Sequence, residues 1–342
     1  MLFRLSLISA TLVLSACSQS PSLGQAAPVH TSEPAALNQA APSQYFALGD
    51  WKLTLPEHET SGKRKGKARE INKHQLSQGF ISQEWFYYDN ARQAMVFKAP
   101  NDAPTTPNSK NARSELRAMY AEKYDEPANN FVLASHPDAE KYGSIGGQLS
   151  ATVSVDWVSQ SGDANKTGAY SVVIGQIHAA KNEPLKIAYR KLPGHDLGSL
   201  YWGYELNPPK AQQKSKLRKD IRSNVWGKYN LKAGDESPLD GIALGEKFHY
   251  DVEVKGDVMT LTFIKHPGEA NEESKTFQVD LAHGHYQGHD IDQGYGDDWM
   301  YFKAGAYNQC NTKASSSACQ YRGADSGDYT QVSFYQLDLA RF

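Results

Sequence analysis

The chain lacks the features that mark several large classes of protein. Its 36 lysine and arginine residues are balanced by 38 aspartate and glutamate residues, so the net charge is −2 at pH 7. A nucleic-acid-binding domain usually has a strong basic excess, and we therefore expect no nucleic-acid partner. The apolar run near the N-terminus is too short to span a bilayer as a helix. Windows with the spacing of a long amphipathic helix are scarce, which argues against a helical fold.

The N-terminal residues have the layout of an export signal. Arg4 precedes the apolar run LSLISATLVLSAC, and LSAC resembles the lipobox of bacterial lipoproteins, which ends at the lipidated cysteine. The resemblance implies a lipoprotein-type signal peptide over residues 1–16 and lipidation of Cys17. The alternative is an ordinary signal peptide cut nearby, with Cys17 incidental. We expect an exported protein that is anchored to the outer membrane through acyl chains, or otherwise a periplasmic or secreted one.

The composition changes after residue 43. Residues 17–43 are mainly Ala, Pro, Ser and Gln, with almost no large apolar side chains, and we predict a flexible tether. No second segment of this kind follows, so residues 44–342 are predicted to form one domain, which we expect to be monomeric. Only three cysteines occur. With Cys17 assigned to lipid, Cys310 and Cys319 remain as a pair in an exported protein, and we expect a disulfide between them.

Alternation of apolar and polar residues recurs along the chain and predicts β-strands. It is clearest in residues 148–157, where the side chains expected to face the core are Leu149, Ala151, Val153, Val155 and Trp157. Similar patterns cover residues 248–265, with a hairpin turn at KGD, and residues 331–342. Many such strands predict an all-β sandwich of two antiparallel sheets, of jelly-roll type. Residues 190–245 are irregular and are predicted to form long loops over one face.

Three short segments combine an apolar face with a face of charged or reactive groups. On a strand, RSELR presents one face made of Arg113, Glu115 and Arg117. In SVVIGQIH, Gln176 and His178 are expected on one face of a strand, with Val173, Gly175 and Ile177 on the opposite face. In YFKAGAYNQ, Lys303 and Tyr307 are opposed by Phe302, Ala304 and Ala306. Gly305 is expected to leave room for a sugar ring on the polar face, whereas Asn308 falls on the core side without identified partners.

Each segment also has an ordinary interpretation. The first could be a ladder of surface ion pairs, the second a surface histidine and glutamine on an edge strand, and the third an aromatic strand with a stabilising hydroxyl. Together they are better explained by a carboxylated substrate, because the planar fork of arginine grips a carboxylate with two parallel hydrogen bonds.

RSELR, QIH and YFKAGAYNQ, in that order, resemble the three signature blocks of the polysaccharide lyase family 7 (PL7) alginate lyases. The segment YFALGDWKLTLP, residues 45–56, resembles the strand that opens their catalytic domain. The resemblance covers nearly all of the chain from Tyr45 to Phe342. It implies that residues 44–342 are an alginate lyase catalytic domain, a jelly-roll with a concave cleft for this poly-uronate. The implied reaction is β-elimination at the 1,4-glycosidic bond, which leaves a 4,5-unsaturated uronate and requires no cofactor or metal.

The resemblance assigns the catalytic roles to Arg113, Gln176, His178 and Tyr307. The first two would bind the substrate carboxylate and stabilise the enolate-like dianion. Tyr307 would protonate the glycosidic oxygen, with His178 as the base for guluronate and Tyr307 serving both steps for mannuronate. Ile177 in QIH is associated in the family with acceptance of guluronate.

Three further residues are expected to contact substrate or support the site: Glu115, Arg117 and Lys303. We expect Glu115 to orient the two arginines. Lys303 and Arg117 are the cations expected to lower the pKa of Tyr307.

Other interpretations remain open. HGHYQGHDID contains His283, His285, His289, Asp290 and Asp292, but the spacing matches no closed metal template, and we predict a polar surface loop. One rival function is a jelly-roll glycoside hydrolase, which would use paired carboxylates. The other is a non-catalytic carbohydrate-binding lipoprotein that uses Arg113, Arg117 and Lys303 for capture only.

Overall fold

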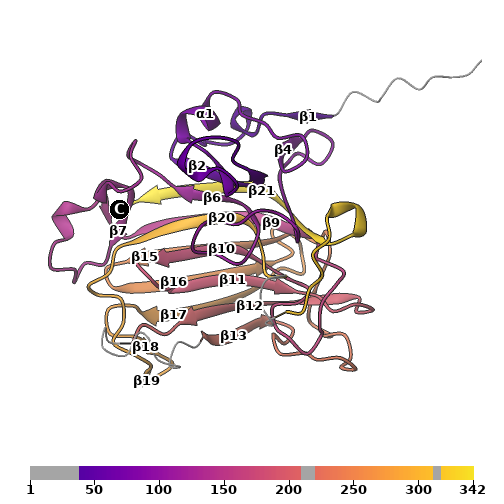
Figure 1. Ribbon diagram of the computed structural model, residues 1–342. Coiled ribbons are helices and arrows are strands. Elements are labelled where there is room, and N and C mark those ends of the chain that lie inside the picture. Colours follow the sequence, from indigo (N-terminus) through magenta and orange to yellow (C-terminus); the bar gives the residue numbers. More distant parts are fainter. Residues whose placement is uncertain (1–37, 209–219, 311–316) are drawn as a thin grey trace, which may run out of the picture. The chain divides into compact units, whose positions relative to one another are not determined.

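The computed structural model describes residues 38–208, 220–310 and 317–342 (Figure 1). Cys17, the predicted signal peptide and residues 17–37 of the predicted tether lie outside the described residues. The folded unit begins at Asn38, earlier than expected. Gln39 pairs with Asp89 and Ala40 with Tyr88, so residues 38–43 belong to the fold and not to a tether. Their backbone finds hydrogen-bond partners on a sheet edge, which composition does not reveal.

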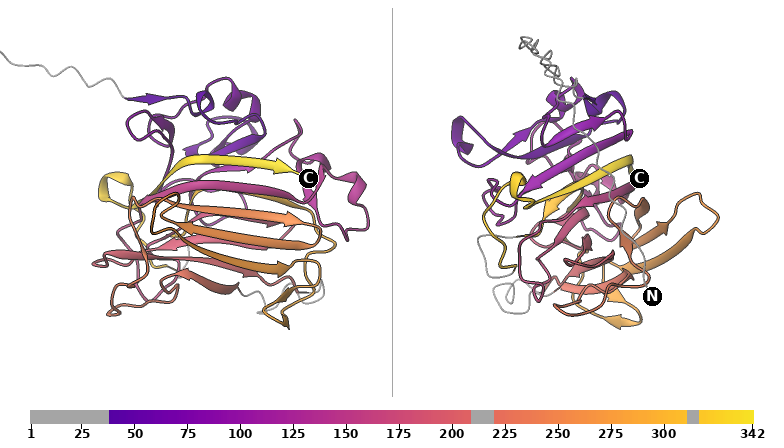
Figure 2. Two further views of the ribbon diagram at one scale, coloured as in Figure 1. Left: turned by 180° about the vertical axis from the view of Figure 1, so that it is seen from behind. Right: turned by 90° about the vertical axis from the view of Figure 1, so that its right-hand side faces the viewer.

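The described residues form two stacked sheets, as Figure 1 and the side view in Figure 2 show. The first, sheet A, contains in spatial order β1 (Gln39–Ala40), β4 (Phe86–Asp89), β5 (Ala94–Pro100), β21 (Tyr329–Arg341), β9 (Gly147–Trp157), β15 (Phe248–Lys255), β16 (Val258–Lys265), β17 (Glu273–Asp280), β18 (His285–Tyr286) and β19 (His289–Asp290).

The second, sheet B, contains β13 (Asp220–Trp226), β12 (Leu197–Glu205), β11 (Leu185–Arg190), β10 (Ser171–Ala179), β20 (Met300–Asn308), β6 (Arg113–Ala118), β2 (Trp51–His58) and β3 (Ala68–Ile71). Three short strands lie beside this path: β14 (Ile242–Ala243), β7 (Phe131–Val132) and β8 (Ser144–Ile145). Apart from the parallel pair β7–β8, the pairings are antiparallel, so the expected sandwich of two antiparallel sheets is confirmed.

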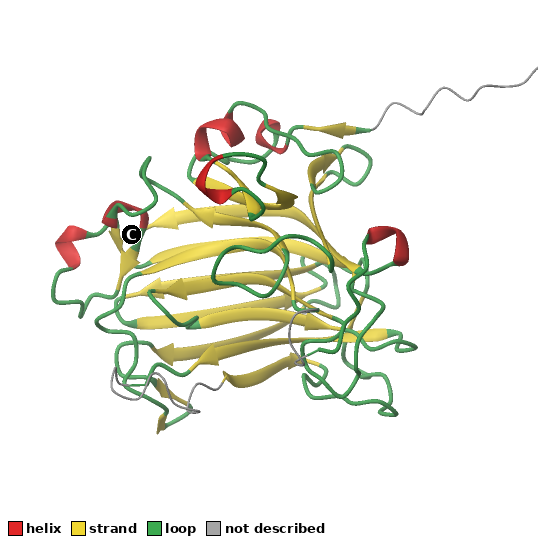
Figure 3. Cartoon of the chain, viewed as in Figure 1, coloured by secondary structure: helices red, strands yellow, loops and turns green. Residues whose placement is uncertain are grey.

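Helical structure is minor within the described residues and lies around the periphery of the sheets (Figure 3). It consists of α1 (Lys73–Ser77) and the 3₁₀ turns η1 (Pro42–Gln44), η2 (Gly62–Arg64), η3 (Pro127–Asn129), η4 (Ala139–Lys141) and η6 (Ala324–Ser326). Asn72 caps α1 by accepting a hydrogen bond from the Gln75 backbone N–H. Within the described part of the chain, no helix is long and apolar enough to cross a membrane.

The core lies between the sheets and is built by the alternation seen in the sequence. Strands β15 and β16 alternate buried and part-exposed residues, and Lys255 pairs with Val258 across the predicted hairpin turn. Gly256 adopts a positive φ of 62° in that turn, a conformation that glycine accepts without a steric penalty.

Two predictions about sheet positions were wrong. Trp157 does not continue the core face of β9: its ring lies parallel to Tyr329, because the β9–β21 register shifts between Gln331 and Val332. Residues 190–245 are not only loops, since they supply β12, β13 and β14 of sheet B. Nearly all of β12 is buried, so its sequence shows no alternation of apolar and polar residues that would have predicted a strand.

Candidate active site

The three chemically suggestive segments form adjacent strands in the middle of sheet B. Strand β20 lies between β6 and β10. Lys303 pairs with Arg117 on one side and with Gln176 on the other, while Tyr307 pairs with Arg113. Since side chains opposite each other in a sheet share a face, these residues gather on the face of sheet B that points away from sheet A, here called the open face.

Glu115 is the centre of a hydrogen-bonded cluster on this open face. Its side chain is 2% exposed, and its Oε2 accepts a hydrogen bond from Arg113 Nη1 at 2.9 Å and one from Lys303 Nζ. The other oxygen, Oε1, accepts a hydrogen bond from Gln176 Nε2. Both carboxylate oxygens are therefore occupied, and we define these four residues as the Glu115 cluster.

The Glu115 cluster carries one more positive than negative charge. Burial alone would raise the pKa of Glu115, but the charges of Lys303 and Arg113 hold it below its ordinary value. Burial, together with the charge of Arg113, lowers the pKa of Lys303 to about 8 despite the contact with Glu115. The cluster is thus one negative charge short of balance near neutral pH, which is the condition for receiving an anionic group.

Tyr307 lies directly beside this surplus charge. The Arg113 guanidinium carbon is 3.9 Å from the centre of the Tyr307 ring, and Ser109 Oγ is 3.2 Å from the phenol oxygen. Ser109 Oγ also accepts a hydrogen bond from Arg113 Nη2 at 2.9 Å. Among the described residues, Nε of Arg113 is buried without a hydrogen-bond partner. The guanidinium and the phenol are therefore held together, and the Nε–H of the arginine is unpaired.

His178 follows two residues after Gln176 and lies at the end of β10. Its ring stacks on Tyr301, with ring centres 5.1 Å apart and planes 9° from parallel. Burial and the charge of Lys303 lower the pKa of His178 to about 4. The imidazole is therefore neutral at neutral pH, which is the state that a proton acceptor requires.

The open face continues from Tyr307 toward β13. A small apolar group contains Val173, Ala188 and Tyr201, with Tyr229 and Tyr307 packed against it. A pocket beside it is lined by Lys186, Asp220 and Arg222 among others. The site is thus open along the sheet on the side of β11 to β13, as binding of a chain-like substrate requires.

Comparisons with known proteins agree with this geometry. A family model described as alginate lyase matches residues 46–341. An alginate lyase of Klebsiella pneumoniae is 34% identical over 306 residues, which are 87% of this chain and 90% of that protein. The chain belongs to the alginate lyase family. It is therefore a polysaccharide lyase.

Solved structures of alginate lyases share the fold of this family member. The crystal structure of the alginate lyase from Klebsiella pneumoniae has a TM-score of 0.68 at 32% identity and covers 88% of this chain and 99% of that one. An exolytic PL7 alginate lyase from Zobellia galactanivorans has the same TM-score at 29% identity, with 88% and 98% coverage. The jelly-roll prediction is confirmed.

Some expected contacts are absent from the site of this family member. Glu115 does not orient both arginines: it contacts Arg113, whereas the Arg117 guanidinium lies between the rings of Tyr301, at 4.0 Å, and Tyr124, at 4.3 Å. Arg117 is therefore not one of the cations at Tyr307. Lys303 is 5.7 Å from the Tyr307 ring centre, and Arg113 is the nearer cation. The alternation pattern predicted which side chains lie on the same face of the sheet. It did not predict which of them are in contact across neighbouring strands.

A bulge explains two further corrections. Val173 pairs with Tyr307 and Gly175 with Ala304, so two residues of β20 stand opposite the single residue Ile174. At the other edge of β10, Val173 pairs with Ala188 and Gly175 with Ile187, which are consecutive in β11, so β10 itself also has one extra residue. Val173 consequently faces the open side, not the core. Gly305, at φ 143°, has no room to spare, because an added Cβ would lie 2.6 Å from the Ser114 carbonyl oxygen and 3.2 Å from the Phe97 ring. The glycine permits close strand packing and does not make space for a sugar.

Three residues in contact with the site were not predicted from the sequence: Ser109, Tyr301 and Glu183. Ser109 lies in a loop without a motif. Tyr301 lies within the YFKAGAYNQ segment, two residues before Lys303. Its position in the alternation could therefore have placed it on the same face as Lys303. Glu183 follows β10 by four residues, and only the folded loop brings it to His178.

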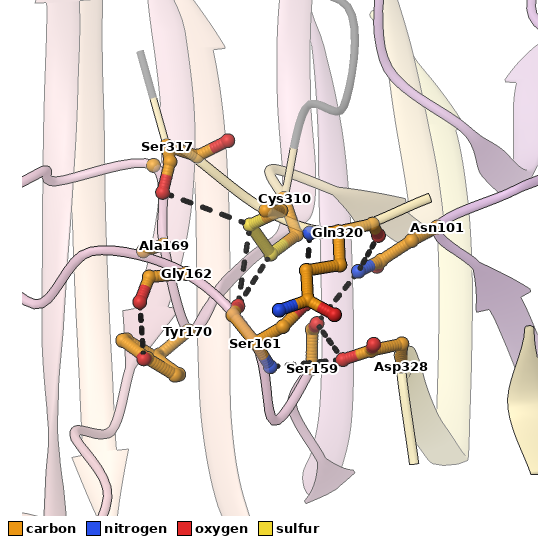
Figure 4. The surroundings of a disulfide bond; sticks show 12 residues. Asn101, Ser159, Ser161, Gly162, Ala169, Tyr170, Cys310, Ser317, Gln320 and Asp328 are labelled. Atoms are coloured by element: carbon orange, nitrogen blue, oxygen red, sulfur yellow. Dashed lines mark hydrogen bonds between the residues drawn. A yellow bond between two sulfur atoms is a disulfide. The ribbon is translucent and has the colours of Figure 1, made fainter. Parts of the chain in front are cut away.

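The expected disulfide joins Cys310 and Cys319, whose Cα atoms are 5.5 Å apart (Figure 4). Both sulfur atoms contact the carbonyl oxygen of Ser161. Nearby, the buried Asp328 carboxylate accepts hydrogen bonds from Ser159 and from the Ser161 N–H, as Figure 4 also shows. The disulfide therefore fixes the chain just beyond β20.

Asn308, the last residue of β20, is fully buried and its partners are now identified. Its Nδ2 donates to the Ala99 carbonyl at 3.1 Å and to Asn101 Oδ1 at 2.8 Å, and its Oδ1 accepts from the Cys310 N–H at 2.9 Å. These bonds hold the strand end that carries Tyr307.

Two of the three histidines in residues 283–292 interact with separate carboxylates. His283 Nδ1 is 3.0 Å from Asp280, and His285 Nδ1 is 2.9 Å from Asp290. Asp292 instead accepts hydrogen bonds from Tyr204 and from the Asn207 N–H. Within the described ranges, no group of three or more potential ligands is placed to hold a metal ion.

Proposed function

We propose that this chain is a PL7 lyase that cleaves alginate by β-elimination and accepts guluronate-containing blocks. The observation that carries the proposal is the Glu115 cluster, which lacks one negative charge and lies against Tyr307 on the open face. Each uronate carries a carboxylate beside C5, so substrate binding would complete the charge balance at the carbon that loses its proton.

Arg113 and Gln176 are the proposed carboxylate-binding residues. Removal of the C5 proton places a second negative charge on the carboxylate, and donors held in advance lower the energy of that dianion. Arg113 supplies a partly exposed guanidinium for this purpose, and Lys303 adds a second positive charge. Gln176 donates to Glu115 in the absence of substrate, which fixes its amide at the site.

Tyr307 is the proposed acid that protonates the glycosidic oxygen as the C4–O bond breaks. The half-buried phenol is held by Arg113 and Ser109, so its hydroxyl has a defined position. His178 is the proposed base for guluronate, where the C5 hydrogen and the leaving group are on opposite faces. For mannuronate they are on the same face, and Tyr307 serves both steps.

A hydrolytic mechanism is less consistent with this site. A glycoside hydrolase needs two carboxyl groups that can act as acid and as base or nucleophile. Here both oxygens of Glu115 are occupied by three donors, and its pKa is lowered, so it is a poor proton donor.

The direct test is incubation of the purified protein with alginate while ultraviolet absorbance of the C4–C5 double bond is followed. Elimination gives absorbance together with new chain ends. New reducing ends without absorbance would show hydrolysis. If neither new chain ends nor absorbance is observed, the protein binds the polysaccharide without cleaving it. Guluronate and mannuronate blocks assayed separately give the block preference.

We also propose export and lipid anchoring through Cys17, supported by the LSAC segment. Full-length protein should be recovered in the membrane fraction and should incorporate labelled fatty acid. Cys17→Ser should move it to the soluble fraction. Equal fractionation of the two forms would contradict anchoring.

A further inference from the structure

Glu183 contacts the imidazole of His178 and has no role in the site proposed above. Its Oε1 is 3.4 Å from His178 Nε2, and its Oε2 is 3.8 Å from Lys186 Nζ. Glu183 lies in the short connection between β10 and β11, outside the three signature segments.

The connection is held so that Glu183 keeps this position. Its backbone N–H donates to Glu205 Oε2 at 3.3 Å, and its carbonyl accepts from the Glu205 N–H at 3.1 Å. The neighbouring Asn182 is buried, accepts from the Ala179 N–H and donates to Asn207 Oδ1 at 2.8 Å. The end of β12, the residues just after it and the end of β10 therefore fix the loop around the carboxylate.

The hydrogen bond at the other ring nitrogen determines the state of His178. Nδ1 is 2.5 Å from the Ala179 carbonyl oxygen, which can only accept. Nδ1 must therefore carry the hydrogen, and in the neutral ring the lone pair is on Nε2. The distance of 3.4 Å between His178 Nε2 and Glu183 Oε1 is longer than an ordinary hydrogen bond. The lone pair on Nε2 is therefore free to accept a proton. The His178 side chain is 27% exposed and remains accessible.

The charges that face His178 oppose its protonation, apart from two carboxylates. Burial, Lys303 and Arg113 disfavour the imidazolium, and Tyr301 covers one ring face without charge. The hydrogen bond to the Ala179 carbonyl and the charge of Glu115 favour it, but both oxygens of Glu115 are bound by other donors. Among the described residues, Glu183 is the carboxylate in direct contact with Nε2.

We propose that Glu183 is a positioning residue that stabilises protonated His178 and thereby supports proton removal from guluronate. The C5 proton passes to Nε2, and the electrons of the C5–H bond form the enolate-like dianion. These electrons then form the C4–C5 double bond as the C4–O bond breaks, and Tyr307 donates its proton to the leaving oxygen. The new Nε2–H donates to Glu183 until the proton is lost to solvent, and the Tyr307 phenolate takes up a proton from solvent. This inference rests on the proposed function.

The first test uses Glu183→Gln, Glu183→Asp and a control, Asp280→Asn. The control also removes a carboxylate from a histidine contact, at the exposed His283. We expect Glu183→Gln to lower kcat on guluronate blocks about tenfold, the effect of one pKa unit on the imidazolium, with KM unchanged. Rates on mannuronate blocks should stay within about twofold, since Tyr307 serves both steps there. Glu183→Asp should restore most of the loss, and Asp280→Asn should behave as the wild type.

The second test does not depend on activity. Nitrogen NMR of His178 in the full chain should show hydrogen on Nδ1 at neutral pH, and Glu183→Gln should lower the titration midpoint. An unchanged midpoint, or equal rate losses on both blocks, would overturn the inference. A wild-type protein inactive on both blocks would contradict only the proposed function, and the NMR comparison would still decide the role of Glu183.

Discussion

Each sheet contains a carboxylate with low exposure that accepts hydrogen bonds from several donors. The two carboxylates differ in the number of positively charged donors around them. Asp156 on sheet A, with a side chain 8% exposed, binds Arg92 through two hydrogen bonds of 2.7 and 2.9 Å. Its remaining donors are neutral: Ser154, Gln331 and Ser333. Glu115 on sheet B binds two cations and one amide.

The difference separates a structural cluster from a reactive one. At Asp156 one negative charge meets one positive charge, and the polar groups are satisfied within the protein. At Glu115 one positive charge is left over, the pKa of Lys303 is lowered to about 8 and an arginine Nε is unused. A protein tolerates such an imbalance at a cost in stability, and a ligand carboxylate removes it. The surplus of positive charge on the open face therefore distinguishes the candidate active site from the Asp156 cluster. Burial of a charged group alone does not distinguish the two.

The largest expected effect is at the phenol beside the charged cluster. Tyr307→Phe should lower kcat about a thousandfold, since proton transfer is lost, while folding and oligosaccharide binding stay nearly intact. Tyr335→Phe is the matched control, because its hydroxyl meets Ser154 in the Asp156 cluster. Kinetics and circular dichroism of both variants measure this. Retained activity in Tyr307→Phe would remove that residue from the acid role.

Arginine replacement tests the comparison directly. Arg113→Lys keeps the charge but loses the planar fork, and we expect kcat/KM to fall about a hundredfold. Arg92→Lys makes the same change at Asp156 and should lower stability by about 2 kcal/mol with normal kinetics, since charged hydrogen bonds are weakened there. The comparison fails if the two variants lose activity equally.

Lys303 predicts a pH dependence that the Asp156 cluster cannot produce. Its pKa of about 8 means that the charge is present below this pH and is lost above it. Binding of an anionic substrate should weaken accordingly, so kcat/KM should fall several-fold as pH rises through about 8. Lys186 does not share this transition: burial opposes its charge, but Asp220, Glu183 and Glu205 raise its pKa. A flat profile across this range would argue against a carboxylate-binding role for Lys303.

The disulfide should affect activity least. Replacing Cys310 and Cys319 by alanine should lower the free energy of unfolding by about 2–3 kcal/mol, the chain-entropy estimate for a short loop. The charges at Glu115 are untouched, and kcat should stay within about twofold. Urea unfolding and kinetics of the double variant measure both quantities. A large loss of kcat would show that the disulfide positions Tyr307.

Much of the fold and of the candidate site could be predicted from local pattern. Alternation in β9, β15, β16 and β21 gave the sandwich, because a strand buried on one face must alternate. The same rule placed Arg113, Gln176, His178 and Tyr307 on polar faces, and the apolar run before Gln176 supported a strand there. The rule failed at Trp157 and Val173, where an extra residue in the strand changes the face to which a side chain points. Such a bulge cannot be recognised from the alternation of apolar and polar residues.

The sequence by itself determined the strand content, the cysteine pair and the chemical groups brought to the site. Only the tertiary structure decided their contacts: that Glu115 binds Lys303 and Gln176 from two other strands, that Arg117 lies between two tyrosines, and that Glu183 meets His178. The physical reason is that pattern is local, whereas charge balance depends on neighbours far apart in the chain. Glu115 and Lys303 are 188 residues apart in sequence, and strand pairing alone brings them together.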